Sequence, residues 1–260
     1  VFAPSTVAFF FGMAFTPFLT DFLYKHKLWK KKAGKITPDG KETPIFNSLH
    51  KEKEVGTPRM GGIVIWGSVI ATTITFWLLQ TVFPSEASDK LDFVSRNQTW
   101  LPLFTLLVGS IVGLVDDILQ VRPTGNSAKA GLSFYKRLAI VLALGLIGGY
   151  WFYFKLGMDS VSLPFIEEWQ IGFWLVPLFV LVMVALFSSG VIDGLDGLSG
   201  GIMAIIFAAY TGIAYFQSQI DLAAFCAVVT GGILAFLWFN IPPARFYMSE
   251  TGILGLTTTL

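Results

Sequence analysis

The chain has 260 residues and a net charge of +1, and 54% of its residues are hydrophobic while only 13% are charged. A soluble globular domain carries about 25% charged residues, so this composition excludes an ordinary soluble enzyme. The single cysteine, Cys226, excludes a disulfide framework and a cysteine-based metal site. We therefore expect a polytopic helical membrane protein with membrane lipids, and no nucleic acid, as partners.

Apolar runs long enough to cross a hydrocarbon core of about 30 Å at about 1.5 Å per residue recur along the chain. They lie at residues 7–24, 62–83, 100–115, 134–154, 173–189, 201–216 and 222–239, and an eighth begins near Gly252. We predict an all-α transmembrane bundle with about seven complete helices and the start of an eighth. Residues 1–260 would form one integral-membrane domain, and because the chain starts at Val1 and stops at Leu260 inside an apolar run, we expect incomplete ends.

The distribution of basic residues predicts the orientation in the membrane. The loop over residues 25–59 holds 10 of the 18 Lys and Arg residues, which places it in the cytoplasm. Counting helices onward places three further polar connections on the same face, namely those with Asp116 and Asp117, with Asp193 and Asp196, and with residues 240–250. The opposite loops lean acidic. We therefore expect the polar motifs to converge on one cytoplasmic site.

Two pairs of carboxylates are the strongest functional signals. Asp116 and Asp117 are adjacent at the end of an apolar run, where acids oppose the helix dipole and repel each other unless a cation lies nearby. Asp193 and Asp196 are three apart, so a helix would place them on one face. A charged side chain at membrane depth costs about 2.5–3.5 kcal/mol, which favours a functional cleft over a simple polar turn. Mg²⁺ or diphosphate binding, or general-base catalysis, would suit these acids.

Basic and amide side chains accompany the acids but are less specific. Residues 51–62 combine glycines with Lys53 and Arg59, which suits a phosphate cradle or equally a juxtamembrane turn on anionic lipid. Lys136 stands beside Arg137 at the foot of the fourth run, where cations are also ordinary anchors. Residues 236–252 bring an amide, a guanidinium and a carboxylate together, a set that suits a nucleotide with its metal but could also form an ordinary turn.

Taken in order, these segments resemble the polyprenyl-phosphate N-acetylhexosamine-1-phosphate transferase superfamily, and within it the phospho-N-acetylmuramoyl-pentapeptide transferases. The resemblance rests on GTPRMGG at 56–62, GLVDD at 113–117, DGLDGL at 193–198 and FLWFN at 236–240. The chain departs from the family pattern at Gly190, where the family has Asn, and at Ser249-Glu250, where it has Gly-Asp. The family's downstream His-rich loop, which concerns the sugar-peptide substrate, lies beyond Leu260.

The resemblance implies a fold of about ten helices in the full-length family and a peptidoglycan-synthesis reaction. Undecaprenyl phosphate would attack the sugar-linked phosphorus of UDP-MurNAc-pentapeptide, forming lipid I and releasing UMP with the help of Mg²⁺. It also implies the bacterial cytoplasmic (inner) membrane, an active site on its cytoplasmic face, and a possible homodimer. Direct displacement and a phospho-enzyme route both stay open.

The resemblance also implies roles for single residues. Asp116 would deprotonate or orient the lipid phosphate, with Asp117 and Asp193 as the other catalytic carboxylates. Glu250 would be the Mg²⁺ ligand, since a longer carboxylate can still ligate through oxygen. The expected substrate-binding residues are Lys53, Thr57, Lys136, Asp196 and Asn240.

Three alternatives accompany this reading. A related transferase would use UDP-N-acetylglucosamine, and the missing distal loop would discriminate the two. A transporter or channel could use the same acids for cations, but the acids gather at one face and we find no internal repeat. An inactive relative is motivated by Gly190 and by Ser249-Glu250.

Overall fold

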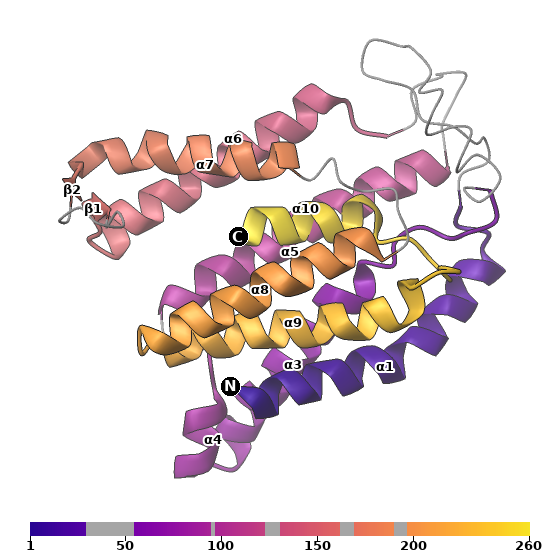
Figure 1. Ribbon diagram of the computed structural model, residues 1–260, viewed down its shortest axis with the longest axis horizontal. Helices are drawn as coiled ribbons and strands as arrows, with labels where there is room; N and C mark the ends of the chain where they lie inside the picture. Colours follow the sequence, from indigo (N-terminus) through magenta and orange to yellow (C-terminus); the bar gives the residue numbers. More distant parts are fainter. Residues whose placement is uncertain (30–54, 95–96, 123–130, 162–168, 190–196) are drawn as a thin grey trace.

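The computed structural model describes residues 1–29, 55–94, 97–122, 131–161, 169–189 and 197–260 (Figure 1). The architecture is all-α, as predicted. The helices are α1 (Phe2–Lys25), α3 (Ile63–Val82), α4 (Glu86–Leu91), α5 (Asn97–Val121), α6 (Phe134–Tyr150), α7 (Leu175–Ser189), α8 (Leu198–Phe216), α9 (Ile220–Asn240) and α10 (Ser249–Thr259). Short pieces connect α6 to α7: a π-helix η1 (Trp151–Lys155), an antiparallel ribbon of β1 (Ser160–Val161) and β2 (Trp169–Gln170), and a 3-10 turn η2 (Gly172–Trp174).

Among the described residues, six helical stretches are long and apolar enough to cross a membrane: Phe2–Lys25, Ile63–Val82, Thr99–Val121, Phe134–Lys155, Leu198–Phe216 and Ile220–Asn240. The predicted fifth run corresponds to η2 and the shorter α7, which has 15 residues. Pro177 lies in the first turn of α7, where its missing N–H removes little. The third helix continues beyond its predicted end to Val121, and α10 begins at Ser249, before Gly252.

Helix α9 is the centre of the main bundle. It contacts α1, α3 and α8, and it is buried on nearly all sides from Ala223 to Phe236. A helix that is apolar all round belongs in such a position, since no face of it needs water. Helix α10 lies along α5 and touches α3 and α7. Helix α10 therefore lies between the main bundle and the α6–α7 pair (Figure 1).

The α6–α7 hairpin stands beside the main bundle in Figure 1. Its inner side packs in a second hydrophobic cluster, in which Val141, Leu144 and Met183 meet Leu254 of α10. The facing side of α5 contributes Val108 and Val112 to the same cluster. The start of α6 is thereby held near the end of α5 and the start of α10.

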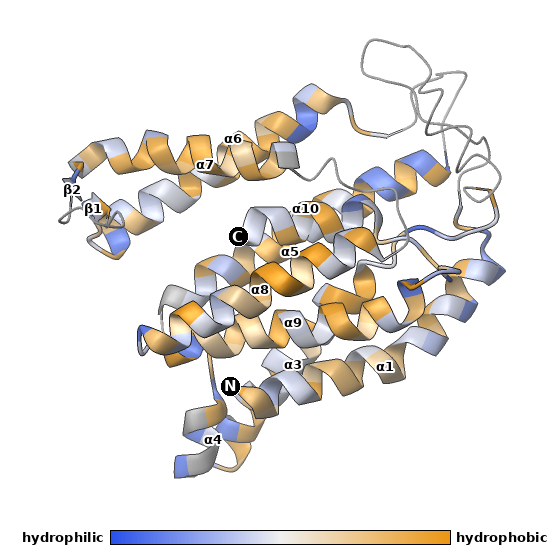
Figure 2. Ribbon diagram, viewed as in Figure 1, coloured by the Kyte–Doolittle hydropathy of each residue, from blue (hydrophilic) through white to orange (hydrophobic). Residues whose placement is uncertain are grey.

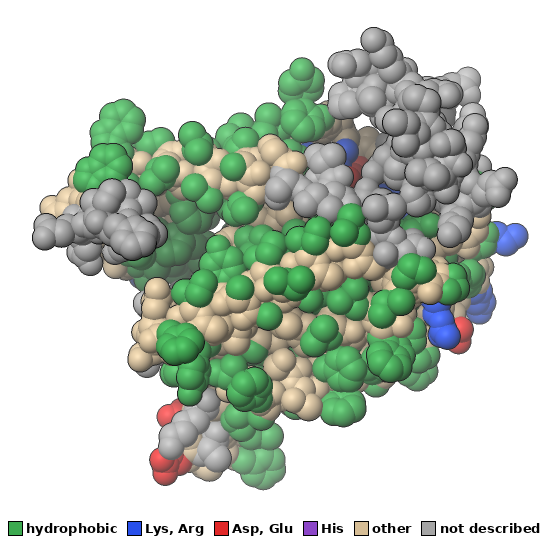
Figure 3. Space-filling view, in the orientation of Figure 1, with side chains coloured by type: hydrophobic (Ala, Val, Ile, Leu, Met, Phe, Trp, Pro, Cys, Tyr) green, Lys and Arg blue, Asp and Glu red, His purple; other side chains and the backbone are tan. Residues whose placement is uncertain are grey.

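The outer surface is apolar along the helices and polar at their ends (Figures 2 and 3). Large side chains such as Phe216, at 90% exposure, and Trp174, at 76%, point outward. Such exposure would be costly in water but suits hydrocarbon. Together with the six long apolar helices, this surface makes the chain an integral membrane protein of the polytopic helical class.

Candidate active site

Glycines on α5 create the contact on which the site depends. Gly109, Gly113 and Asp117 are four residues apart, so they share one face of the helix, and this face meets α10. A Cβ at Gly113 would overlap the carbonyl oxygen of Glu250, and one at Gly109 would overlap the side chain of Thr258. The glycines therefore let α10 lie directly on α5, and Asp117 meets the first turn of α10.

Asp117 ties that first turn in place. Its Oδ2 accepts hydrogen bonds from the backbone N–H of Thr251 at 3.0 Å and from the Thr251 hydroxyl at 2.6 Å. The Arg59 Nε donates to Asp117 Oδ1 at 3.1 Å, and the Asp117 side chain is fully buried. A carboxylate at a helix N-terminus is favourable because it meets unpaired N–H groups and the positive end of the dipole. Both carboxylate oxygens of Asp117 therefore make contacts that stabilise the fold.

Asp116 faces a different direction. It continues the α5 stripe of Val108 and Val112, which faces the α6–α7 pair. Its Oδ1 accepts a hydrogen bond from the backbone N–H of Leu132, just before α6, and its Oδ2 accepts one from Gln120 Nε2 at 3.1 Å. Asp116 and Asp117 therefore point in different directions from α5, and each accepts hydrogen bonds from its own set of donors.

Arg137 joins Asp116 to Glu250. Its Nη1 lies 3.6 Å from Asp116 Oδ2 and 2.5 Å from Glu250 Oε1. The Asp116 side chain is fully buried, whereas those of Arg137 and Glu250 are 23% and 26% exposed. We call Arg59, Asp116, Asp117, Arg137 and Glu250 the acid–guanidinium cluster. Its formal charge is negative by one, and Glu250 and Arg137 form its accessible side.

The segment before α3 is fastened to the segment before α10. Gly61 donates its backbone N–H to the Tyr247 carbonyl at 2.8 Å, and the Tyr247 N–H donates to the Pro58 carbonyl at 2.9 Å. A Cβ at Gly62 would overlap the backbone of Gly252. These close backbone approaches explain Gly61 and Gly62 of the GTPRMGG motif, and they set Arg59 beside Asp117.

Asn240, at the end of α9, links two segments through its side-chain amide. Its Oδ1 accepts the Gly197 N–H at 2.9 Å, its Nδ2 donates to the Phe246 carbonyl at 2.8 Å, and the residue is 4% exposed. The amide therefore joins the start of α8 to the loop after α9. Its predicted contact with substrate stays a prediction.

The structure brings together three of the residues predicted for the site, Asp116, Asp117 and Glu250. Lys136 is exposed at the start of α6, next to Arg137, and Thr57 is partly buried in the segment before α3. The predicted residues Lys53, Asp193 and Asp196 lie outside the described residues, as does Gly190. Their predicted roles remain untested.

The carboxylates of the cluster bear on the predicted magnesium site. Across the described part of the chain, no group of three His, Cys, Asp or Glu side chains is placed to hold a metal ion. Asp116 and Glu250 do supply the oxygen donors that Mg²⁺ prefers, and the Arg137 guanidinium already lies between them. The donor chemistry of these two carboxylates therefore suits Mg²⁺, and the magnesium site stays a prediction.

Sequence reasoning missed two of the cluster's partners. Gln120 lies one helical turn after Asp116, a spacing that predicts contact on a helix. Thr251 follows Glu250 in the first turn of α10, where a hydroxyl and a free N–H are available together. The sequence indicates Arg59 and Arg137 only as phosphate contacts or anchors, because it does not say which acid each one meets.

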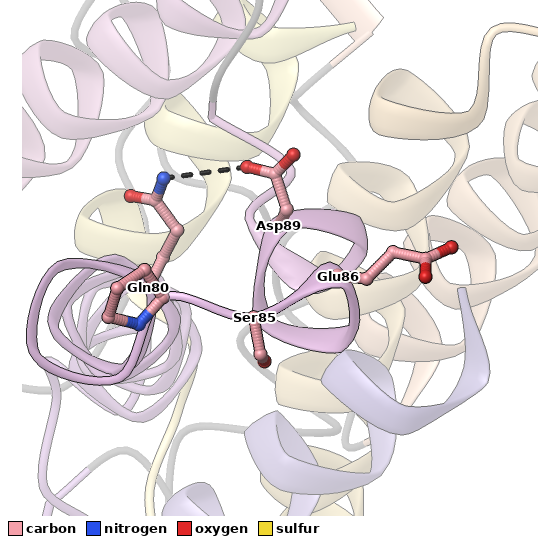
Figure 4. Close-up of a pocket in the computed structure, with 5 residues that line it drawn as sticks. Gln80, Ser85, Glu86 and Asp89 are labelled. Carbon is pink, nitrogen blue, oxygen red and sulfur yellow. Dashed lines mark hydrogen bonds between the residues drawn. The ribbon is translucent and has the colours of Figure 1, made fainter.

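A separate hollow lies near α4, and the cluster contributes no residue to it (Figure 4). It has a volume of about 230 Å³ and is lined by Gln80, Pro84, Ser85, Glu86 and Asp89. The Gln80 amide points toward Asp89 and donates to its Oδ1 at 3.4 Å, while Glu86 points away. This hollow is shaped by the turn from α3 into α4, and we assign it no part in the site.

Fold and cluster together define a membrane-embedded helical protein in which two buried aspartates meet a glutamate and two arginines from three other segments. Residues 99–260 match glycosyl transferase family 4, and the chain belongs to this family. A protein of Chloroflexus aurantiacus named phospho-N-acetylmuramoyl-pentapeptide-transferase is 32% identical over 92% of the chain and 60% of its own length. Proteins of the same name from Listeria innocua and Clostridium novyi are 32% and 29% identical over 96% of the chain, and over 70% and 69% of their own lengths. The chain thus spans about 60% of the Chloroflexus relative.

Proposed function

We propose that this protein transfers phospho-N-acetylmuramoyl-pentapeptide from its UDP conjugate to undecaprenyl phosphate, forming lipid I and releasing UMP. The observation that carries the proposal is the acid–guanidinium cluster, in which Arg59 of GTPRMGG and Thr251 of the segment after FLWFN both contact Asp117 of GLVDD. The names of the relatives support the choice of substrate. A site that joins two anionic substrates needs guanidinium groups, which bind phosphate, and also carboxylates, which handle a proton or a metal.

The surroundings of the two adjacent acids suggest different roles. Asp117 has both oxygens bound by Arg59 and Thr251, so it positions α10 and the arginine. Asp116 shares Arg137 with the accessible Glu250 and is our choice for the carboxylate that orients the lipid phosphate or accepts its proton. Arg137 and the neighbouring Lys136 would attract the substrate phosphates to the start of α6.

Mg²⁺, when bound, would neutralise the diphosphate and stabilise the departing UMP. Glu250 would hold it together with Asp116, and the predicted Asp193 and Asp196 would add ligands. The proposal places the cluster on the cytoplasmic face of the bacterial inner membrane, because the basic loop over residues 25–59 joins α1 to the segment that carries Arg59. A homodimer stays a prediction.

The test of the function is UMP release by membranes that contain the protein expressed from its complete reading frame. We expect release with UDP-MurNAc-pentapeptide and undecaprenyl phosphate, and none when the lipid is omitted. The same assay with UDP-N-acetylglucosamine is the matched comparison. Release only with the second sugar would replace the proposed substrate, and release with neither would overturn the transferase proposal.

Glu250→Gln is expected to raise the Mg²⁺ concentration that gives half-maximal UMP release by about tenfold or more. The amide keeps the shape but loses the charge that attracts a hard divalent ion. The measurement is a Mg²⁺ titration of the reaction at fixed substrate. Glu167→Gln, in the connection between α6 and α7, is the control for the loss of one carboxylate. An unchanged titration for Glu250→Gln would remove this residue from the metal site.

A further inference from the structure

Arg137 lies between two carboxylates that are our candidate metal ligands. One nitrogen, Nη1, lies between Asp116 Oδ2 at 3.6 Å and Glu250 Oε1 at 2.5 Å. We propose that Arg137 is an exchangeable internal cation, which pairs with these carboxylates and transfers to the substrate diphosphate when metal and substrate bind. The inference rests on the proposed function for the identity of that anion.

The contacts of Arg137 with the described residues use only part of the hydrogen-bonding capacity of its guanidinium. A guanidinium has five N–H donors in a planar fork and binds carboxylates best through two parallel hydrogen bonds. Here Nη1 makes the ion pairs with both acids, and the buried Nε has no hydrogen-bond partner among the residues that the structure describes. A buried donor without a partner costs free energy, so Arg137 gains from any anion that can accept from the rest of its fork.

The Arg59–Asp117 pair shows what a committed ion pair looks like in this protein. Asp117 is fully buried, and its other oxygen is taken by two donors of Thr251. Arg137 instead lies on the accessible side of the cluster beside Glu250, whose side chain is 26% exposed. The two arginines therefore differ in function: Arg59 fastens the fold, and Arg137 is placed to change partners.

Competition follows from the shared oxygens. Mg²⁺ requires oxygen ligands at about 2.0–2.1 Å, and a guanidinium bonded to the same oxygen both blocks the approach and repels the ion. A diphosphate that accepts the Arg137 fork releases Glu250 for the metal. Binding of metal and of nucleotide should thus be coupled, each raising the affinity for the other. Metal alone should bind weakly.

The test uses the purified full-length protein in detergent, with Mn²⁺ as the metal probe and UDP as the nucleotide probe. Free Mn²⁺ is followed by electron paramagnetic resonance, and UDP binding is followed by calorimetry at saturating Mn²⁺. Arg137→Gln should bind Mn²⁺ alone about tenfold more tightly, because the competitor is gone, and should bind UDP about tenfold more weakly, because the anion has lost a charged donor.

Arg122→Gln is the matched control, since it removes one exposed guanidinium just beyond the end of α5. Both affinities should stay within about twofold of the parental values, as for an ordinary surface substitution. Opposite shifts in Arg137→Gln support the exchange. A loss of both affinities would mean that Arg137 is a structural pair, and unchanged Mn²⁺ binding would mean that it does not compete, so either result overturns the proposal.

Arg137→Lys provides the second variant if Arg137→Gln does not give a single species on size exclusion. A lysine ammonium is a compact point charge without the planar fork, so it can bridge the two acids less well. We expect Mn²⁺ to bind about threefold more tightly and UDP more weakly, and unchanged Mn²⁺ affinity would again overturn the proposal. UMP release by the parental protein is scored separately, so a failed transferase assignment leaves the Mn²⁺ result interpretable.

Discussion

Asp116→Asn should lower the rate of UMP release by about 100-fold or more, the scale of a lost general base. The amide has nearly the shape of the carboxylate and can still accept the Leu132 N–H. It loses the charge that pairs with Arg137, and it cannot take a proton from the lipid phosphate. The measurement is the initial rate of UMP release at saturating Mg²⁺, in membranes with matched amounts of protein.

Asp21→Asn is the control for this substitution. Asp21 is an exposed carboxylate in the last turns of α1, close in sequence to the basic loop. Its amide variant should keep the parental rate, because no cluster contact involves it. If Asp116→Asn released UMP at the parental rate, the role assigned to Asp116 would be wrong, while the family membership of the chain would stand.

Gly113→Ala should destabilise the protein by about 1–3 kcal/mol and also reduce UMP release by at least about tenfold. The added Cβ would overlap the carbonyl oxygen of Glu250, so α10 must move away from α5. This displacement would stretch the hydrogen bonds between Asp117 and Thr251. Thermal unfolding in detergent measures the first effect, and the UMP assay measures the second.

Gly212→Ala is the matched control. Gly212 also lies inside a long helix, α8, but apart from its own turn of helix no heavy atom of the described residues lies within 4 Å of the position its Cβ would take. Alanine is a better helix former than glycine by about 0.8–1 kcal/mol, so this variant should be neutral or stabilised. If Gly113→Ala behaved like Gly212→Ala, the close approach of α10 to α5 would not be needed for the site.

The two predictions address separate layers of the same site. Asp116 tests the chemistry, since its substitution changes a charge and leaves the packing. Gly113 tests the architecture, since it carries no functional group and acts only through the position of Glu250 and Thr251. A loss of activity in both, with a loss of stability only in Gly113→Ala, is the combination that the proposed site requires.

The sequence predicted the class of fold well because the signal is local. A bilayer demands about 20 consecutive apolar residues with internally satisfied backbone, and the composition of each run meets that demand without reference to any other run. The ends of the helices were less predictable. The run at residues 100–115 ended in the prediction at the first acid, yet α5 continues to Val121, because Arg59, Thr251 and Arg137 offset the charges of Asp116 and Asp117.

Partners separated by more than 100 residues could not be read from the chain. Arg137 and Glu250 are 113 residues apart, and Thr251 is 134 residues from Asp117. No local pattern indicates that the missing side chain of Gly113 leaves room for the start of α10. Nor does any local pattern indicate that the adjacent acids, Asp116 and Asp117, point toward different helices. These facts depend on how helix faces meet, and the faces are chosen by packing.

The sequence by itself therefore determined that this is a polytopic helical membrane protein and which motifs carry its acids and arginines, and it predicted the face on which the basic loop lies. Composition, run length and charge bias are properties of each segment in its solvent, and they need no tertiary information. Only the tertiary structure decided that Asp117 fastens α10 while Asp116 shares Arg137 with Glu250. That division arises because successive residues on a helix point about 100° apart, so two neighbours in sequence meet different neighbours in space.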